Sequence, residues 1–162
     1  MKAITLYQPW ATLVAIGAKK IETRSWNTNY RGPLAIHAGK NTKFIKGDEA
    51  VLDEEPFYSI LMEDSVWHLE IMPLGCIVAT CNLVHVKEMN ELHVFPACKS
   101  YAYKGREWLL NKQERSFGYY AVGRFMWLLD DVIMLPKPIP AKGSMGFWEW
   151  NPTLESAHAT NA

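Results

Sequence analysis

The sequence predicts an α+β fold, a small mixed β-barrel with flanking helices. Three observations lead to this class. Several stretches are rich in β-branched residues, and the longest of them reads GCIVATCNLVHVKEM. Only one or two segments show helical spacing, and they do not alternate regularly with strands, which argues against a doubly wound sheet. The chain also carries no G-x-G-x-x-G motif or other phosphate-binding loop.

The N-terminal half contains a strand, a short helix and two further strands. KAITLYQ alternates loosely, as a strand does. Pro9 suits the first turn of a helix, where its missing N–H costs nothing, and the helix is expected to end at Gly17. The next strands are expected in KKIETRSW and LAIHA. Residues 41–70 are expected to be helical and acidic, with breaks at Gly47 and Pro56.

The C-terminal half adds three strands. GCIVATCNLVHVKEM predicts a long one, whereas residues 90–117 are mixed, with a short helix or loop around 97–103. Residues 125–132 predict a strong strand, which the proline-rich MLPKPIPAKGSMG follows, and GFWEW predicts the closing strand. We expect a single domain over residues 1–151 and a flexible C-terminal tail over residues 152–162.

Composition indicates a soluble cytoplasmic protein. Apolar residues make up 49% of the 162 residues and charged residues 21%. No apolar run approaches the roughly 18 to 20 residues that span a bilayer, and the N-terminus lacks the apolar stretch of a secretory signal. Three cysteines at irregular spacing favour buried thiols in a reducing compartment over a disulfide framework. Their spacing with the histidines matches no zinc site, so we expect no metal.

The net charge of zero conceals an uneven distribution of charge. Residues 1–46 hold eight Lys/Arg and one acidic residue, whereas residues 47–70 hold eight Asp/Glu and no Lys/Arg. A local basic surface can steer an anionic ligand even on a neutral protein. The acidic segment, residues 48–70, could provide a surface for a protein partner. Alternatively, the two blocks form opposite solvated faces or pair with each other.

The charged residues of GAKKIETRSW form the motif G-x-K-x-x-E-x-R, made by Gly17, Lys19, Glu22 and Arg24. On one strand, Glu22 and Arg24 point the same way, about 6.5–7 Å apart. Glu22 can accept hydrogen bonds from a base, and Arg24 offers a planar fork for phosphate. Lys19 lies near the helix end, where partial desolvation would let it transfer a proton.

Two tryptophans flank this motif, Trp10 and Trp26. Each could supply a face on which a base stacks, worth about 1–3 kcal/mol per base. The alternative is structural: the charges would form an ion-pair cluster that ties the helix to the sheet, with both tryptophans in the core.

The motif, with the preceding strand, QPW and helix, resembles the ASCH (activating signal cointegrator homology) family, a branch of the PUA-like superfold. Arg31-Gly32 with LAIHAGK, then GRFMWLL, and finally PKPIPAKGSMGFWEW extend the resemblance over most of residues 3–150. The resemblance implies a pseudobarrel with a cleft, lined by the motif, that suits RNA or a nucleobase-containing ligand. Some relatives hydrolyse acetylated cytidine, and some are ribonucleases.

Six further residues are candidate ligand contacts. The Gln8 amide could read a base edge or cap the helix. His37, mid-strand in LAIHAGK, could face the cleft or be a hydrogen-bonded core residue. Tyr119 could close the cleft, together with the adjacent Tyr120. Positive charge for phosphate could come from Lys40, Arg124 and Lys142, each of which could instead be a solvated basic residue.

Three functions compete. The first is a module that binds RNA or a modified nucleotide in a basic and aromatic cleft. The second is a hydrolase in the same cleft, with Lys19 and Glu22 as proton-transfer groups. The resemblance implies a threonine nucleophile at the position of Glu22 in the acetylcytidine hydrolases, and Thr23 should face away, so we expect a different mechanism. The third is a coactivator accessory domain. No cofactor is expected, apart from a divalent metal if the protein is a ribonuclease.

Overall fold

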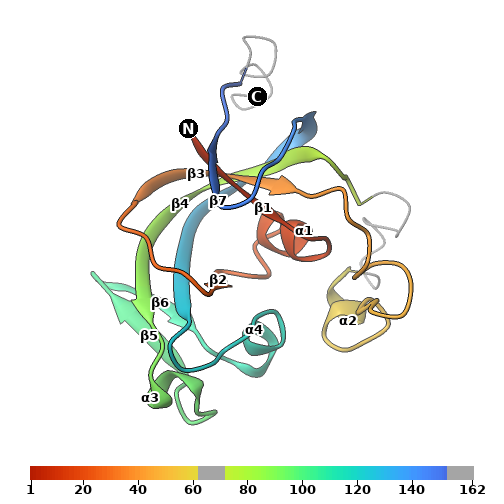
Figure 1. Cartoon of the computed structure of the whole chain (residues 1–162). Helices are drawn as coiled ribbons and strands as arrows, with labels where there is room; N and C mark the ends of the chain where they lie inside the picture. Colours follow the sequence, from red (N-terminus) through yellow and green to blue (C-terminus); the bar gives the residue numbers. More distant parts are fainter. Residues whose placement is uncertain (62–71, 153–162) are drawn as a thin grey trace. The chain divides into compact units, whose positions relative to one another are not determined.

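The structure, a computed structural model, describes residues 1–61 and 72–152. Its elements, in chain order (Figure 1), are β1 (Lys2–Leu6), α1 (Trp10–Ala15), β2 (Ile21–Arg24), β3 (Gly32–Ala38), α2 (Phe57–Leu61), β4 (Cys76–Glu88), α3 (Glu91–Val94), β5 (Ser100–Tyr103), β6 (Arg106–Leu109), α4 (Lys112–Ser116), β7 (Phe125–Pro140) and β8 (Phe147–Glu149). The predicted α+β class is therefore confirmed: long strands dominate, and the helices are few and short.

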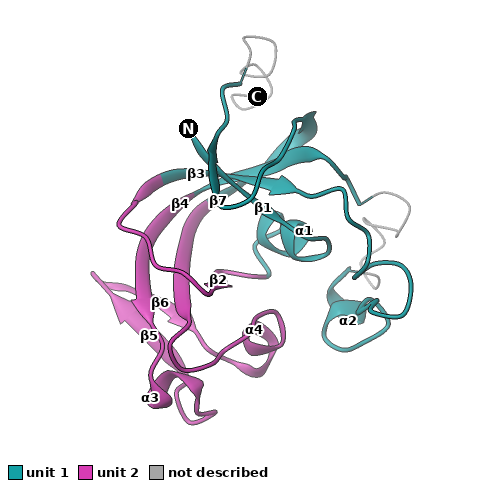
Figure 2. Cartoon of the chain, viewed as in Figure 1, with its two compact units in different colours: residues 1–18, 33–81, 132–162 teal, residues 19–32, 82–131 magenta. Residues whose placement is uncertain are grey.

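The chain divides into two compact units (Figure 2). Unit 1 comprises residues 1–18, 33–81 and 132–162, and unit 2 comprises residues 19–32 and 82–131. The strands β4 and β7 are long enough to contribute residues to both units. The single domain expected over residues 1–151 stays a prediction, and residues 153–162 of the expected tail lie outside the described residues.

Unit 1 is built on the strand order β7-β4-β3-β1-β8. β1 pairs in parallel with β3, from Lys2 opposite Leu34 to Leu6 opposite Ala38, and antiparallel with β8. β3 reads GPLAIHA, and its last five residues are buried, as expected for a strand covered on both faces. One core cluster of this unit contains the buried residues Ala3, Ala35, Ile77, Leu135 and Trp150.

Unit 2 holds the three charged residues of the motif, Lys19, Glu22 and Arg24. β2 pairs antiparallel with β7, from Ile21 opposite Leu128 to Arg24 opposite Phe125, and β7 is followed in the order by β4. In the same unit, β5 and β6 pair antiparallel as a hairpin. A core cluster of Ile21, Met89, Trp108, Leu110, Met126 and Leu128 lies in this unit.

The expectation of a helical segment over residues 41–70 is wrong for its described first part. Residues 41–56 form turns and bends, and the helix α2 begins only after Pro56. Single turns close at Thr42 and Gly47, whose carbonyls accept from Ile45 and Ala50, but they do not propagate. Gly47 has φ of +95°, which no helix tolerates. Residues 62–70 lie outside the described residues.

Two further predictions, one of a helix or loop and one of a strand, also need correction. Residues 97–103 are neither a helix nor a simple loop, because Ser100–Tyr103 pairs with Arg106–Leu109. Their turn uses Lys104 and Gly105, with φ of 49° and 77°, as the tightest hairpins require. The strand expected over residues 125–132 runs on to Pro140, through three prolines at alternate positions. The strands expected in KAITLYQ, KKIETRSW, LAIHA, GCIVATCNLVHVKEM and GFWEW are confirmed as β1, β2, β3, β4 and β8.

Candidate functional site

Lys19 lies at the centre of a buried ionic cluster in unit 2. Its side chain is fully buried, and its ammonium donates to the carbonyl oxygen of Ile21. The Nζ atom lies 3.6 Å from Oε2 of Glu22 and 3.9 Å from Oε1 of Glu114. A buried cation needs such partners, because leaving water without them costs several kcal/mol. The cluster holds β2 and α4 together through Lys19.

Glu114 comes from α4, more than ninety residues along the chain from the motif. Asn111 caps this helix, and its side chain accepts from the backbone N–H of Glu114. The Glu114 carboxylate in turn accepts from the backbone N–H groups of Lys20 (2.9 Å) and Ile21 (3.1 Å). These are the residues at the start of β2, so Glu114 holds the motif strand by its backbone as well as by charge.

The other end of β2 presents two arginines. The Nε of Arg24 lies 3.1 Å from Oε1 of Glu22, which confirms that these two side chains share one side of the strand. Arg124 donates to the carbonyls of Tyr119 (3.1 Å) and Thr23 (3.3 Å), and its guanidinium lies 4.9 Å from the Tyr119 ring centre. The Thr23 hydroxyl accepts from the backbone N–H of Tyr119. Thr23 therefore fastens Tyr119 and Arg124 beside the motif.

Burial shapes the electrostatics of this cluster. It raises the pKa of Glu114, an effect that Lys19 and the two backbone N–H groups oppose and that the nearby Glu22 reinforces. Burial also raises the pKa of Tyr120, and the neighbouring Glu114 adds to this shift. The Tyr120 phenol is therefore neutral and able to donate at physiological pH. Carboxyls and phenols with displaced pKa values are common at functional sites, although structural ion-pair networks displace them too.

Both motif-flanking tryptophans pack against other aromatic rings. In unit 2, Trp26 meets Trp127 edge to face, with ring centres 4.6 Å apart. In unit 1, Trp10 meets Phe44 and Phe57 edge to face, at 4.9 and 5.9 Å. Each tryptophan is half-buried, so part of each ring remains at the surface.

His37 is held inside unit 1. Its ring is 2% exposed, with Nε2 3.1 Å from the carbonyl oxygen of Ala141 and Nδ1 3.2 Å from the Thr5 hydroxyl. Trp148 meets the ring edge to face at 5.4 Å. Burial lowers the pKa of His37, which the bond to Ala141 partly offsets. The ring therefore has the contacts of a hydrogen-bonded core residue.

The remaining predicted residues of unit 1 fall into two environments. Gln8 is fully buried; its amide donates to the carbonyl of Pro73 and accepts from the backbone N–H of Thr12, in the first turn of α1. Lys40 and Lys142 are exposed. Both amide ends of Gln8 are thus in use inside the protein, whereas the two lysines can meet an anion.

The structure adds Glu114 to the cluster, and this residue was not a candidate on sequence grounds. Asn111 and Glu114 do stand at capping-box spacing, N-x-x-E, and this spacing marks a helix N-terminus. That signal could have identified the helix, but not the strand whose N–H groups the carboxylate binds.

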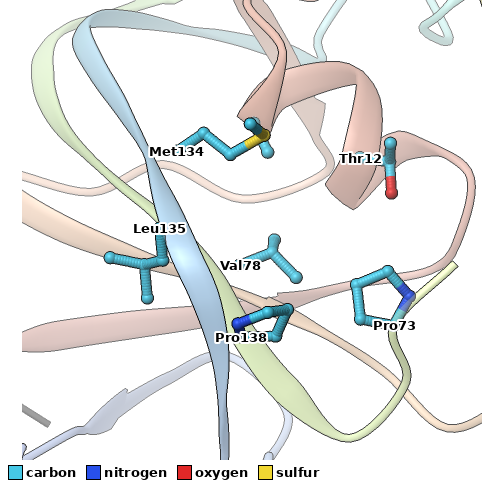
Figure 3. A pocket seen from close by; sticks show the side chains of 7 residues that line it. Thr12, Pro73, Val78, Met134, Leu135 and Pro138 are labelled. Carbon is cyan, nitrogen blue, oxygen red and sulfur yellow. The ribbon is translucent and has the colours of Figure 1, made fainter. Parts of the chain in front are cut away.

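A small hollow in unit 1 is lined by Thr12, Ala15, Pro73, Val78, Met134, Leu135 and Pro138 (Figure 3). Its volume is about 10 Å³, roughly the room that one water molecule needs. The lining is mostly apolar, and the buried Thr12 hydroxyl forms no hydrogen bond with the described residues. The hollow is too small for a nucleobase.

The described residues contain neither a candidate metal-binding cluster nor a candidate membrane-spanning helix. Within residues 1–61 and 72–152, no three His, Cys, Asp or Glu side chains gather closely enough to hold a metal ion. Over the same ranges, no helix has the length and apolar character needed to cross a membrane.

Comparison with known proteins agrees with these features. Residues 4–129 match the family model of the ASCH domain. Activating signal cointegrator 1 is 32% identical over 81 residues in Homo sapiens and 33% over 82 residues in Mus musculus. Each alignment covers 50% of this chain and 13% of the relative, so the chain matches a small part of those proteins.

Solved structures extend the likeness to nearly the whole chain. The crystal structure of ASCH from Zymomonas mobilis has a TM-score of 0.50 and 12% identity, covering 98% of this chain and 91% of that one. A single-residue mutant of the same protein also has a TM-score of 0.50 and 12% identity, covering 97% and 93%. At this identity the likeness concerns the fold alone.

Proposed function

Since this chain belongs to the ASCH domain family, we propose that it binds single-stranded RNA or a modified nucleotide, with β2 at the centre of the binding surface. RNA binding is general among ASCH domains. The proposal assigns the binding surface to unit 2, where the charged residues of the motif, Lys19, Glu22 and Arg24, lie together with their supporting residues.

One observation carries the proposal: two arginines are fixed in place near the end of β2. Arg24 is held by Glu22, and Arg124 by the carbonyls of Tyr119 and Thr23. Arg24 is 23% exposed. A guanidinium that is already oriented loses less entropy on binding, and each charged hydrogen bond to phosphate contributes about 1.5–3 kcal/mol.

Lys19 has a different role in this proposal. Because its side chain has no exposed surface, it cannot touch an RNA strand in this conformation. It holds the Glu22 carboxylate, which in turn orients Arg24. Lys19 is therefore a positioning residue, and Glu22, at 12% side-chain exposure, lies between it and the ligand.

Fluorescence anisotropy with labelled oligouridine tests the proposal. We expect Arg24→Ala to weaken binding about tenfold or more, and Lys137→Ala, on an exposed lysine of unit 1, to leave it unchanged. The slope of log affinity against log salt should become shallower by about 0.7 for each phosphate that a variant no longer binds. Binding that ignores salt and survives Arg24→Ala would overturn the proposal.

A hydrolase is the second candidate, favoured by the buried Lys19 between two carboxylates, one with a raised pKa. This arrangement can transfer protons. Glu22 would act as a general base on water. The Thr23 hydroxyl already accepts from Tyr119 and is 8% exposed, so it is poorly placed to be a nucleophile.

Mass spectrometry of products tests this candidate. Wild-type, Glu22→Gln and Thr23→Ala proteins would be incubated with oligouridine and with acylated nucleosides, with and without magnesium or manganese. Turnover that disappears in Glu22→Gln but persists in Thr23→Ala is expected of this hydrolase. Turnover with the reverse pattern would establish the threonine mechanism, and no product at all would leave binding as the function.

A protein partner is a third proposal, because the matched relatives are named as a cointegrator. In the described part of the acidic segment, the side chains of Asp48, Glu49, Asp53, Glu54 and Glu55 are exposed. Only Glu49 among them forms an ion pair with the described residues, with Lys43 at 3.0 Å. Charge reversal over residues 53–55 should release such a partner without weakening RNA binding, in a pull-down with purified components.

A further inference from the structure

A stack of aromatic rings lies in unit 2 beside β4. The His85 and Tyr103 rings are nearly parallel, at 13°, with centres 3.9 Å apart. Tyr101 is also parallel to His85, at 7°, with its hydroxyl 3.4 Å from Nε2 of His85. The pairs of Trp26 with Trp127 and of Trp10 with Phe44 instead meet edge to face. The stack is therefore a flat arrangement, with spacing close to that of stacked bases.

Three cations lie near enough to His85 to act on its charge. Arg31, Lys87 and Lys104 each disfavour the charged form of His85, so that the pKa of this histidine is lowered first by burial and then by these charges. Lys104 lies over the Tyr103 ring, with Nζ 5.4 Å from its centre. No ion pair joins any of the three to an acidic group within residues 1–61 and 72–152.

The backbone fixes these groups in one place. His85 and Lys87 are two residues apart on β4, so their side chains leave the same face of the strand. Lys104 lies in the hairpin turn directly after Tyr103. The Arg31 guanidinium donates from Nη1 to the carbonyls of Thr28 and Tyr30, which leaves its other N–H groups for a further acceptor.

We propose that His85 and Tyr103 form a base-stacking platform, on which one nucleobase of a single-stranded RNA lies while its neighbouring phosphates bind Arg31, Lys87 and Lys104. The proposal rests on the proposed RNA-binding function and deepens it, by placing a second contact in unit 2 apart from the arginines of the motif. A flat ring face recognises an unpaired base, and the uncompensated cations complement its phosphates. An acidic peptide would use the cations but would gain nothing from the stack.

Anisotropy with labelled oligouridine tests the platform through matched variants. Tyr103→Leu removes the ring and Tyr103→Phe keeps it, so we expect the first to weaken binding roughly 5- to 100-fold and the second to bind like wild type. Lys87→Ala with Lys104→Ala should lower the salt slope by about 1.4, that is, about 0.7 for each lysine. Lys137→Ala serves as the control for removal of an exposed lysine.

NMR of the His85 ring adds a second readout of binding, in which the upfield shift separates a stacked base from loss of folding, because unfolding removes the Tyr103 ring from the histidine. A phosphate bound by the cations should raise the pKa of His85, and a stacked base should shift its ring protons upfield. If wild type binds oligouridine but Tyr103→Leu and the double lysine variant bind equally well, the platform is refuted while the RNA-binding function stands. If wild type shows no binding, both proposals fail.

Discussion

Replacing Glu114 with glutamine should destabilise the protein by about 2–4 kcal/mol. The carboxylate is 6% exposed and accepts from two backbone N–H groups, those of Lys20 and Ile21. Glutamine retains one oxygen and turns an NH₂ group toward the second donor, so a buried N–H loses its partner at a cost of about 1–3 kcal/mol. Lys19 also loses one of its two carboxylates.

The upper limit of this estimate comes from ion pairing. Removing one partner of a buried pair costs about 3–5 kcal/mol when the other is left alone. Here Glu22 remains 3.6 Å from the Lys19 ammonium, so the full cost should not appear. We therefore expect a value between the loss of one hydrogen bond and the loss of an isolated pair.

Urea unfolding followed by circular dichroism measures this effect. Glu88→Gln, at the exposed end of β4, is a matched control and should change the free energy of unfolding by less than about 0.5 kcal/mol. A double-mutant cycle with Lys19→Met should give a coupling energy of about 1 kcal/mol or more. A loss below about 1 kcal/mol for Glu114→Gln would refute the view that this carboxylate organises the cluster.

The pH dependence gives a second check on the same residue. Burial raises the pKa of Glu114 above 4.5, so between 4.5 and the raised pKa the folded state binds more protons than the unfolded state. The contribution of Glu114 to the free energy of unfolding therefore falls as pH rises through this window. The difference in the free energy of unfolding between wild type and Glu114→Gln should therefore decrease as the pH rises above about 4.5. An upward slope would show that Lys19 and the backbone donors outweigh burial.

Three further outcomes concern unit 1 and the cysteines. Gly143→Ala should cost about 1–3 kcal/mol in thermal unfolding, because the new Cβ would lie 2.3 Å from the His37 ring, whereas the neighbouring Lys142→Ala should cost little. The lowered pKa of His37 means that its stabilisation is present above pH 6.5 and is lost as pH falls below it; His37→Gln should flatten this part of a stability–pH curve, and an unchanged curve would count against it. Iodoacetamide should label the half-buried Cys98 first in the native protein, and Cys81 last, because burial raises the pKa of Cys81 to about 12; early labelling of Cys81, read by mass spectrometry, would contradict this.

The strands that could be predicted from the sequence are those in which the residues of the strand itself carry the signal. β4 is a run of β-branched residues, and β2 alternates so clearly that Glu22 and Arg24 were placed on one side correctly. The hairpin of β5 and β6 was missed because its turn, Lys104-Gly105, is not one of the strong hairpin pairs. The helical expectation over residues 41–56 failed because acidic composition alone does not form a helix.

The candidate site likewise contains residues with a local sequence signal and residues that only long-range contacts bring in. Lys19, Glu22 and Arg24 could be chosen from eight consecutive residues. Glu114 could not, because its role depends on a contact across more than ninety residues. The His85 platform was equally hidden, since the parallel rings come from β4 and from a hairpin that the sequence did not reveal.

The three prolines of β7 affect whether copies of this protein can associate through the edge of this strand. The N–H of Ala141 donates to the carbonyl of Gly75, just before β4, and successive backbone nitrogens point to opposite sides of a strand. The nitrogens of Pro136, Pro138 and Pro140 therefore face away from β4. On the side away from β4, β2 covers only Phe125–Leu128. Within the described parts of the chain, no strand pairs with the proline-bearing part of β7 on that side.

A strand edge without N–H groups cannot template another strand, and natural proteins use proline in this way to prevent edge-to-edge association. The proline-bearing end of β7 is thereby closed to a second copy of the chain by composition alone. Threonine at positions 136 and 138 would restore two donors to this edge and turn it into a surface on which β-sheet can grow.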